Sequence, residues 1–132
     1  MKTVLVADDD QALSAILVRI LENENFRVLH ETDGPSALET ARRQRPDLII
    51  LDLMMPYLDG LGVLMKLQGD DPPLEAPVII LTAQESEEFG DLAEALGAVK
   101  FIEKPFDVSE FVKAVHDAME PGKKNDAERG GL

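Results

Sequence analysis

The chain has 132 residues, 45% of them hydrophobic, so it is long enough to build one domain with a substantial core. A net charge of −13 argues against direct binding to nucleic acid, and the lack of cysteine excludes disulfides and thiolate metal sites. No apolar run approaches the roughly 18 residues that a membrane span needs, and the first residues lack a signal-peptide pattern. We therefore expect a cytoplasmic protein that does not contact a membrane.

Short apolar runs typical of buried strands alternate with segments that have the hydrophobic period of a helix. In chain order, we expect strands at 4–7, 26–31, 48–52, 78–82 and 101–103. The intervening helices are expected near 11–21, 34–43, 60–67, 87–96 and 108–119, with a proline-rich loop at 69–77. Apolar residues at helical spacing predict a buried face on three of these helices. On the first helix the face is made by Leu13, Ile16, Leu17, Ile20 and Leu21, and on the fourth by Phe89, Leu92, Ala93 and Leu96. On the last helix it is made by Val108, Phe111, Val112, Val115 and Met119.

Capping residues support several of these helix boundaries. Asp10 and Asp59 stand where a side chain can accept hydrogen bonds from the first turn of the first and third helices. Gly97 suits the end of the fourth helix, where glycine accepts a left-handed backbone. Asp107, followed three residues later by Glu110, predicts a variant of the capping box at the start of the last helix.

Five successive strand–helix repeats predict an α/β fold, a doubly wound parallel sheet with helices on both faces. The second and fifth strands are the most polar, so we expect them at the edges, in the order 2-1-3-4-5 of flavodoxin-like (βα)5 proteins. Residues 1–119 are expected to form this domain. Residues 120–132 have no periodicity and are expected to be a flexible tail or the start of a linker.

Polar residues follow the strands at the end where a doubly wound sheet binds its ligands. Asp8 and Asp9 follow the first strand, Asp52 ends the third, Thr82 ends the fourth, and Lys104 follows the fifth. Clustered carboxylates repel one another unless a cation lies between them, and an oxygen-only ligand set favours Mg²⁺. A carboxylate can also accept a phosphoryl group. This pattern predicts a Mg²⁺ and phosphoryl site.

The residues at these strand ends resemble the receiver domain of two-component response regulators, of which CheY is typical. The resemblance extends from about Lys2 to Met119 and comprises five motifs in order: Val6-Ala7-Asp8-Asp9-Asp10, Pro46-Asp47 through Leu51-Asp52, Met55-Pro56 with Asp59-Gly60, Leu81-Thr82-Ala83 and Lys104-Pro105-Phe106. Each motif alone is weak, and their order carries the resemblance. Tyr57 and Leu58 replace the pair that is commoner in this family.

The resemblance implies that Asp52 accepts a phosphoryl group from the phosphohistidine of a sensor histidine kinase or a phosphotransfer protein. Asp8, Asp9, Asp52 and the backbone carbonyl of Met54 would hold Mg²⁺. Lys104 would bind the phosphoryl group, and the Lys104–Pro105 peptide bond would be cis. The domain would be a signalling module, not an enzyme apart from its own phosphorylation and dephosphorylation.

The resemblance also implies a conformational switch. Thr82 and the Ala83 N–H would bind phosphoryl oxygens, and the Thr82–Phe101 pair would then change the surface of the fourth helix, fifth strand and fifth helix. That surface would bind a downstream effector or output domain, or a second copy of the chain. Gln84 supplies no carboxylate to assist hydrolysis of the phosphoryl group.

Other interpretations of these residues stay open. The chain could be a pseudo-receiver that binds partners without phosphorylation. A Mg²⁺-dependent aspartyl-phosphate phosphatase is disfavoured, because Met54 stands where phosphatases of the haloacid-dehalogenase type carry a second Asp. A nucleotide or flavin binder is disfavoured by the lack of a glycine-rich phosphate loop. His30 and His116 are expected to be structural or surface residues remote from the predicted site.

Overall fold

The computed structural model describes residues 1–83 and 87–120, without the side chains of residues 87–90. Strands and helices alternate throughout: β1 (Thr3–Ala7), α1 (Gln11–Asn23), β2 (Arg27–Glu31), α2 (Gly34–Gln44), β3 (Leu48–Asp52), α3 (Gly60–Gln68), β4 (Val78–Thr82), α4 (Glu87–Ala95), β5 (Ala98–Glu103) and α5 (Val108–Met119). The predicted alternation is confirmed, with boundaries that differ by a few residues at most.

All five strands are parallel and lie in the order β2-β1-β3-β4-β5, which confirms the predicted topology. Edge strand β2 is partly exposed, whereas every residue of β3 and β4 is buried. The central strands are apolar because both of their faces are covered, as is usual in parallel sheets.

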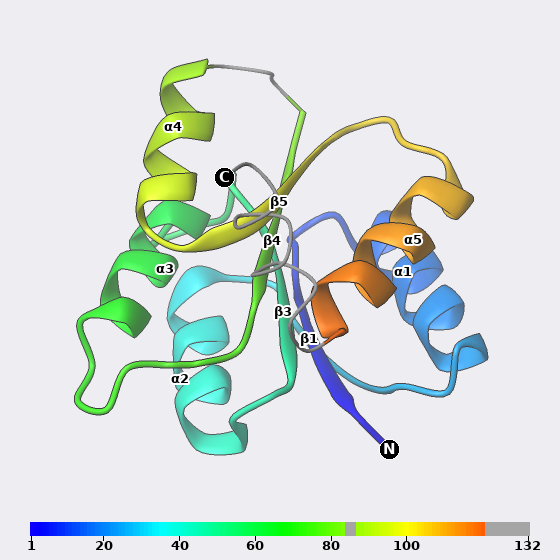
Figure 1. Ribbon diagram of the computed structural model, residues 1–132, viewed down its shortest axis with the longest axis horizontal. Coiled ribbons are helices and arrows are strands. Elements are labelled where there is room, and N and C mark those ends of the chain that lie inside the picture. Colours follow the sequence, from blue (N-terminus) through cyan, green and yellow to red (C-terminus); the bar gives the residue numbers. More distant parts are fainter. Residues whose placement is uncertain (84–86, 121–132) are drawn as a thin grey trace, which may run out of the picture.

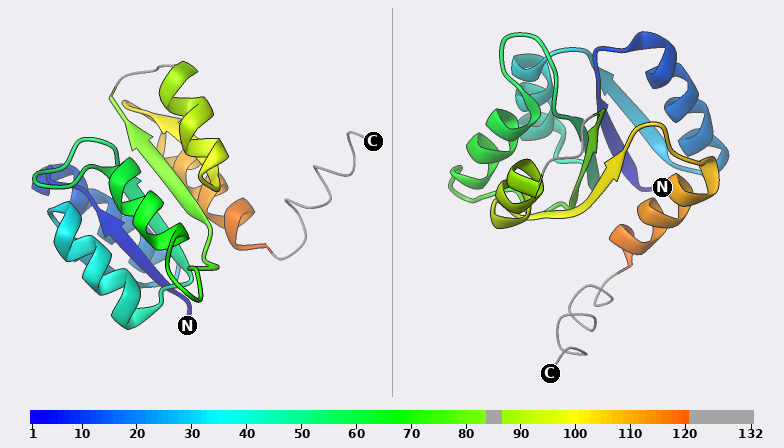
Figure 2. Two further views of the ribbon diagram at one scale, coloured as in Figure 1. Left: turned by 90° about the vertical axis from the view of Figure 1, so that its left-hand side faces the viewer. Right: turned by 90° about the horizontal axis from the view of Figure 1, so that it is seen from above.

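Helices α2, α3 and α4 cover one face of the sheet, and α1 and α5 cover the other (Figure 1). Figure 2 shows the same three-layer arrangement from two further sides. Successive strand residues contribute to opposite cores, so that Ile49 and Leu51 pack beneath α2 and α3 whereas Leu48 and Ile50 pack beneath α1 and α5. The sheet is thus held between two separate hydrophobic layers.

Several helix ends are stabilised as the sequence predicts. Asp10 accepts a hydrogen bond from the N–H of Leu13, and Asp59 caps α3 in the same way. Asp33 caps α2, with Pro35 in its first turn. Gly97 follows α4 with a φ of 100°, a conformation that favours glycine.

Two predictions about helix surfaces are wrong. Asp107 precedes α5, but its side chain makes no capping hydrogen bond, so the capping box with Glu110 does not form. Ile16, Leu92 and Val108 were expected on buried faces and are 55%, 44% and 55% exposed. Ile16 and Leu92 lie at the margins of the apolar stripes of α1 and α4, where the width of the contact with the sheet decides burial, whereas Val108 is the first residue of α5. The predicted contribution of Phe89 lies outside the described side chains.

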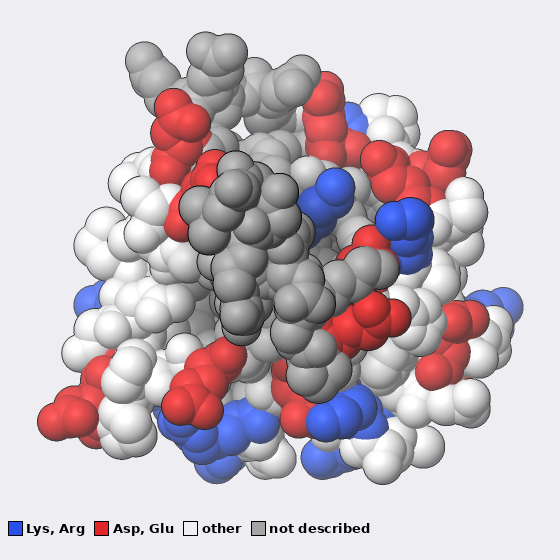
Figure 3. Space-filling view, in the orientation of Figure 1, with Lys and Arg blue, Asp and Glu red and all other residues white. Residues whose placement is uncertain are grey.

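The surface carries many acidic side chains with Lys and Arg between them (Figure 3). Within the described part of the chain, no helix has both the length and the apolar character needed to cross a membrane.

Candidate functional site

The register of the sheet brings the carboxylates of two strands together. Ala7 pairs with Leu51 between β1 and β3, so the next residues, Asp8 after β1 and Asp52 at the end of β3, lie side by side. Both are buried, with 0% and 5% of their surface exposed, whereas Asp9 is exposed. Each of the three aspartates offers a carboxylate oxygen, and these oxygens lie within 4.8 Å of one another.

Lys104 completes this cluster from the end of β5. Its Nζ lies 3.0 Å from Oδ2 of Asp8 and 3.3 Å from Oδ2 of Asp52. One ammonium faces three carboxylates, so two negative charges are left in excess. An oxygen-only ligand set with that excess charge fits a hard divalent cation such as Mg²⁺.

The surroundings shift the protonation equilibria of buried Asp52 and partly buried Lys104. Burial raises the pKa of the Asp52 carboxyl from 3.8 to about 6; the charge of Asp8 adds to this rise, while the Met54 N–H and the Lys104 ammonium oppose it. Burial acts to lower the pKa of Lys104, but its hydrogen bond to Asp8 and the charge of Asp52 outweigh burial and raise it. The site therefore holds a charged lysine beside a carboxylate that is costly to ionise without a further cation.

Two residues outside the predicted set hold the backbone of Asp8. The Ser14 hydroxyl donates to the Asp8 carbonyl at 3.3 Å, and Nε2 of His30 lies 3.3 Å from the same oxygen. The expectation that His30 is remote from the site is therefore wrong. His30 pairs with Val6 in the sheet, two residues before Asp8, so the register of β2 against β1 brings it to the site. His116, in contrast, contacts Glu24 at the edge between α1 and α5.

The remaining predicted residues surround this cluster. Thr82 ends β4, is buried, and accepts a backbone hydrogen bond of 2.7 Å from the N–H of Lys104 through its carbonyl. Phe101 pairs with Ile80 in the sheet, so Phe101 and Thr82 belong to the same face, and the half-buried Phe101 packs against the core beneath α2 and α3. Ala83 is exposed directly after Thr82.

The loop after β3 also contributes to the site. The Met54 N–H donates to Oδ1 of Asp52 at 3.1 Å, while the Met54 side chain is largely exposed. The Lys104–Pro105 peptide bond is cis, as the resemblance implied. Gln84 lies outside the described residues.

Curated proteins with similar sequences are transcriptional and response regulators. The alkaline phosphatase synthesis transcriptional regulatory protein PhoP of Bacillus subtilis is 38% identical over 117 residues, which cover 86% of this chain and 48% of PhoP. The response regulator MprA of Mycobacterium leprae is 36% identical over 126 residues, which cover 94% of this chain and 54% of MprA. The chain thus spans about half the length of the curated relatives that it matches.

Solved structures show the same fold. The Francisella response regulator 1452 receiver domain has a TM-score of 0.83 and 32% identity, covering 90% of this chain and 97% of its own. The chemotaxis protein CheY4 of Vibrio cholerae also has a TM-score of 0.83, with 27% identity, covering 89% of this chain and 98% of its own. The model of the response regulator receiver domain matches residues 4–116. The chain therefore belongs to the response regulator receiver domain family of two-component systems.

Proposed function

We propose that Asp52 is the phosphoacceptor of this receiver domain. The observation that carries the proposal is the position of Asp52, buried at the end of β3 with two further aspartates and Lys104 around it. A carboxylate oxygen of Asp52 attacks the phosphorus of a phosphohistidine, and an O–P bond forms. The P–N bond breaks, and its electron pair stays on the imidazole nitrogen of the donor.

The residues beside Asp52 have separate roles in this proposal. Lys104 moves from its contact with the Asp52 carboxylate to an oxygen of the bound phosphoryl group, which keeps an ammonium opposite the added negative charge. The Thr82 hydroxyl and the Ala83 N–H donate to further phosphoryl oxygens. These assignments are supported by the place of each residue at its strand end.

The carboxylates of Asp8, Asp9 and Asp52 and the Met54 carbonyl would hold Mg²⁺. When bound, the ion would neutralise the oxygens of the transferring phosphoryl group. The chain's own contribution is to fix the ligands. Asp8 accepts from the N–H of Asp10 at 2.9 Å and from Lys104, so both of its oxygens have partners in the absence of a metal.

Phosphorylation would act on partners through the pair Thr82 and Phe101. Drawing the Thr82 hydroxyl toward the phosphoryl group leaves space on its face of the sheet, and the Phe101 ring, half-buried on that same face, moves inward. This shifts the population between two arrangements of the α4–β5–α5 surface. The donor would be a histidine kinase or phosphotransfer protein. The partner that binds the changed surface would be a downstream effector, an output domain or a second copy of the chain.

The experiment is incubation with acetyl phosphate and Mg²⁺ followed by measurement of the intact mass. We expect one phosphoryl adduct on the wild type and on Asp91→Asn, an exposed acid on α4 as matched control, and none on Asp52→Asn or with EDTA. An adduct on Asp52→Asn would refute the acceptor. If acetyl phosphate gives no adduct, a phosphorylated histidine kinase is the second donor, and failure with both donors would contradict the proposal and favour a pseudo-receiver.

A further inference from the structure

A groove between α2 and α3 is separate from the phosphoacceptor site. It has a volume of about 750 Å³, and its apolar lining comes from Pro35 and Leu38 on α2 and from Tyr57 and Leu58 in the loop before α3. We call it the α2–α3 groove. The two helices that line it, α2 and α3, lie on the face of the sheet that also carries α4 (Figure 1).

Charged side chains line the groove beside its apolar part. Arg42, Arg43 and Lys66 supply three cations, and Arg42 and Arg43 are paired with Asp70 and Glu39, at 2.8 Å in each case. Lys66, in the last turn of α3, has no ion pair among the residues that the structure describes. Glu39 also lines the groove, so two of the three cations are neutralised and Lys66 is the one that is free to meet a carboxylate.

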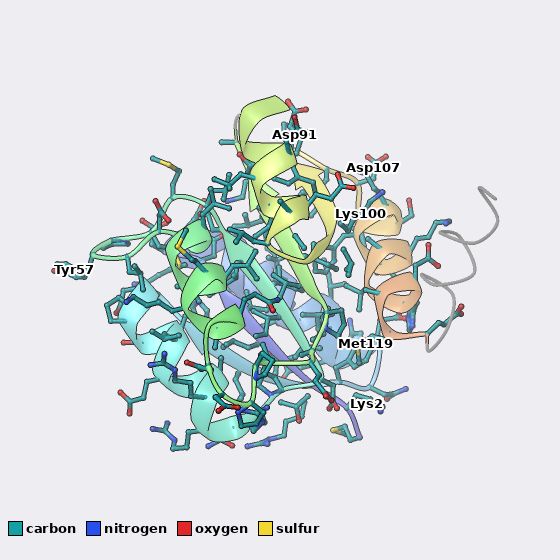
Figure 4. All side chains as sticks on the ribbon, turned by 60° about the vertical axis from the view of Figure 1, so that its left-hand side comes forward. Lys2, Tyr57, Asp91, Lys100, Asp107 and Met119 are labelled. Atoms are coloured by element: carbon teal, nitrogen blue, oxygen red, sulfur yellow. The ribbon has the colours of Figure 1, made fainter. Side chains whose placement is uncertain are left out.

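Tyr57 is the most unusual residue of the groove. Its side chain is 91% exposed, so the ring adds almost nothing to the core, and Figure 4 shows it projecting away from the body of the molecule. Its φ of 69° is costly for a bulky side chain and would be adopted more easily by glycine or asparagine. Neither burial nor backbone geometry explains an aromatic residue here, so the outlier points to a function outside the fold.

The backbone beside Tyr57 is hydrogen-bonded within the loop and to the start of α2. The carbonyl of Pro56 accepts hydrogen bonds from the N–H groups of Leu58, at 2.8 Å, and Gly34, at 3.3 Å. Gly34 packs so closely on the loop that a Cβ atom there would lie 1.9 Å from the Leu58 carbonyl oxygen. Exposed aromatic side chains are common anchors in protein interfaces, and here the backbone that carries the ring is held by the fold.

We propose that the α2–α3 groove docks an acidic peptide segment of a partner protein. Apolar side chains of the segment would lie against Leu38, Leu58 and the ring of Tyr57, and a carboxylate would face Lys66. The unpaired charge of Lys66 selects an acidic segment. A nucleic acid fits less well, because its continuous phosphate charge would be repelled by the rest of the chain, whose net charge is −13.

The test uses the full, unphosphorylated chain, so it can fail or succeed independently of the proposed function. The probe is a displayed library of random 14-residue peptides, and the peptides that it enriches are then synthesised and titrated. We expect them to combine Asp or Glu with apolar residues. Lys66→Glu and Tyr57→Gly should each weaken their binding at least tenfold, and glycine suits the backbone at position 57, so the fold should persist.

Matched controls change the same properties outside the groove. Lys100→Glu reverses the charge of an exposed lysine on β5, remote from Tyr57 (Figure 4), and Met65→Ser removes an exposed apolar side chain from α3. Both should leave the affinity within twofold of the wild type, with circular dichroism showing that every variant is folded. If Tyr57→Gly does not fold, Tyr57→Asn replaces it.

Three results would overturn the proposal. The library could enrich no peptide, or only peptides without acidic residues. The enriched peptides could bind Lys66→Glu and Tyr57→Gly as tightly as the wild type. A single-stranded oligonucleotide, titrated in parallel, could bind more tightly than any peptide and lose its affinity in Lys66→Glu, which would assign the groove to nucleic acid.

Discussion

Replacing Asp52 by Asn should stabilise the metal-free protein, although it removes the proposed phosphoacceptor. In the folded chain, burial and the charge of Asp8 raise the pKa of Asp52 from 3.8 to about 6. Well below pH 3.8 the carboxyl is protonated in both the folded and the unfolded chain, and its burial as an ion costs no stability. As the pH rises, the unfolded chain ionises first, so the folded chain loses stability until the pH has passed about 6.

The size of this loss follows from the pKa difference. At about 1.4 kcal/mol for each pH unit, full ionisation above pH 6 costs at most about 3 kcal/mol. Water at the open edge of the site reduces that cost, and we expect Asp52→Asn to gain about 1 to 3 kcal/mol at pH 8. Asparagine keeps the shape of the side chain and an oxygen that can accept from the Met54 N–H, so packing should change little.

Urea unfolding in EDTA, followed by far-ultraviolet circular dichroism, measures the difference, since the chain has no tryptophan. The advantage of Asp52→Asn over the wild type should fall at pH 5 to about half its value at pH 8. Asp91→Asn, which removes one exposed charge from α4, is the control and should show no such trend. A variant no more stable than the wild type at pH 8, or an advantage independent of pH, would refute the reasoning.

Four further changes test other parts of the structure. Asp9→Ala should weaken Mg²⁺ binding at least tenfold by calorimetry, and undiminished affinity would remove Asp9 from the metal site. Asp59→Ala should lower the free energy of unfolding by about 1 kcal/mol because α3 loses its capping side chain, whereas Asp59→Asn should cost far less. Gly34→Ala should destabilise the chain by about 2 kcal/mol or more, since its methyl group would overlap the Leu58 carbonyl; wild-type stability would show that the loop can move away. Arg45 has a φ of 46°, so Arg45→Gly should unfold at a higher urea concentration than Arg45→Ala, and the reverse order would show that this backbone is not strained.

Features that depend on neighbouring residues are predictable from the sequence. The apolar runs of β3 and β4, with hydrophobic side chains on both faces, contrast with polar β2 and indicate which strands lie inside the sheet. The capping positions of Asp10 and Asp59 follow from short-range hydrogen bonds, and the structure confirms them. Strand ends in a parallel sheet meet at one edge, which is why Asp8, Asp52 and Lys104 could be placed together.

Features that depend on distant segments could not be predicted in this way. Whether Ile16 or Leu92 is covered depends on how wide a contact each helix makes with the sheet, and the helical period does not contain that width. His30 meets the Asp8 carbonyl only because β2 lies beside β1 in one register. The α2–α3 groove joins Leu38 from α2, Tyr57 from the loop after β3 and Lys66 from α3.

The sequence by itself therefore determined the order of strands and helices, the topology of the sheet and the group of acids and lysine at its edge. These follow from hydrophobic period, caps and the geometry of parallel strands, all of which are encoded over a few residues. Only the tertiary structure decided which atoms touch and how far burial raises the pKa of Asp52. It also decided that Tyr57 is exposed to solvent and does not pack in the core. Desolvation and packing depend on the whole surroundings of a group, and distant segments supply those surroundings only when the chain has folded.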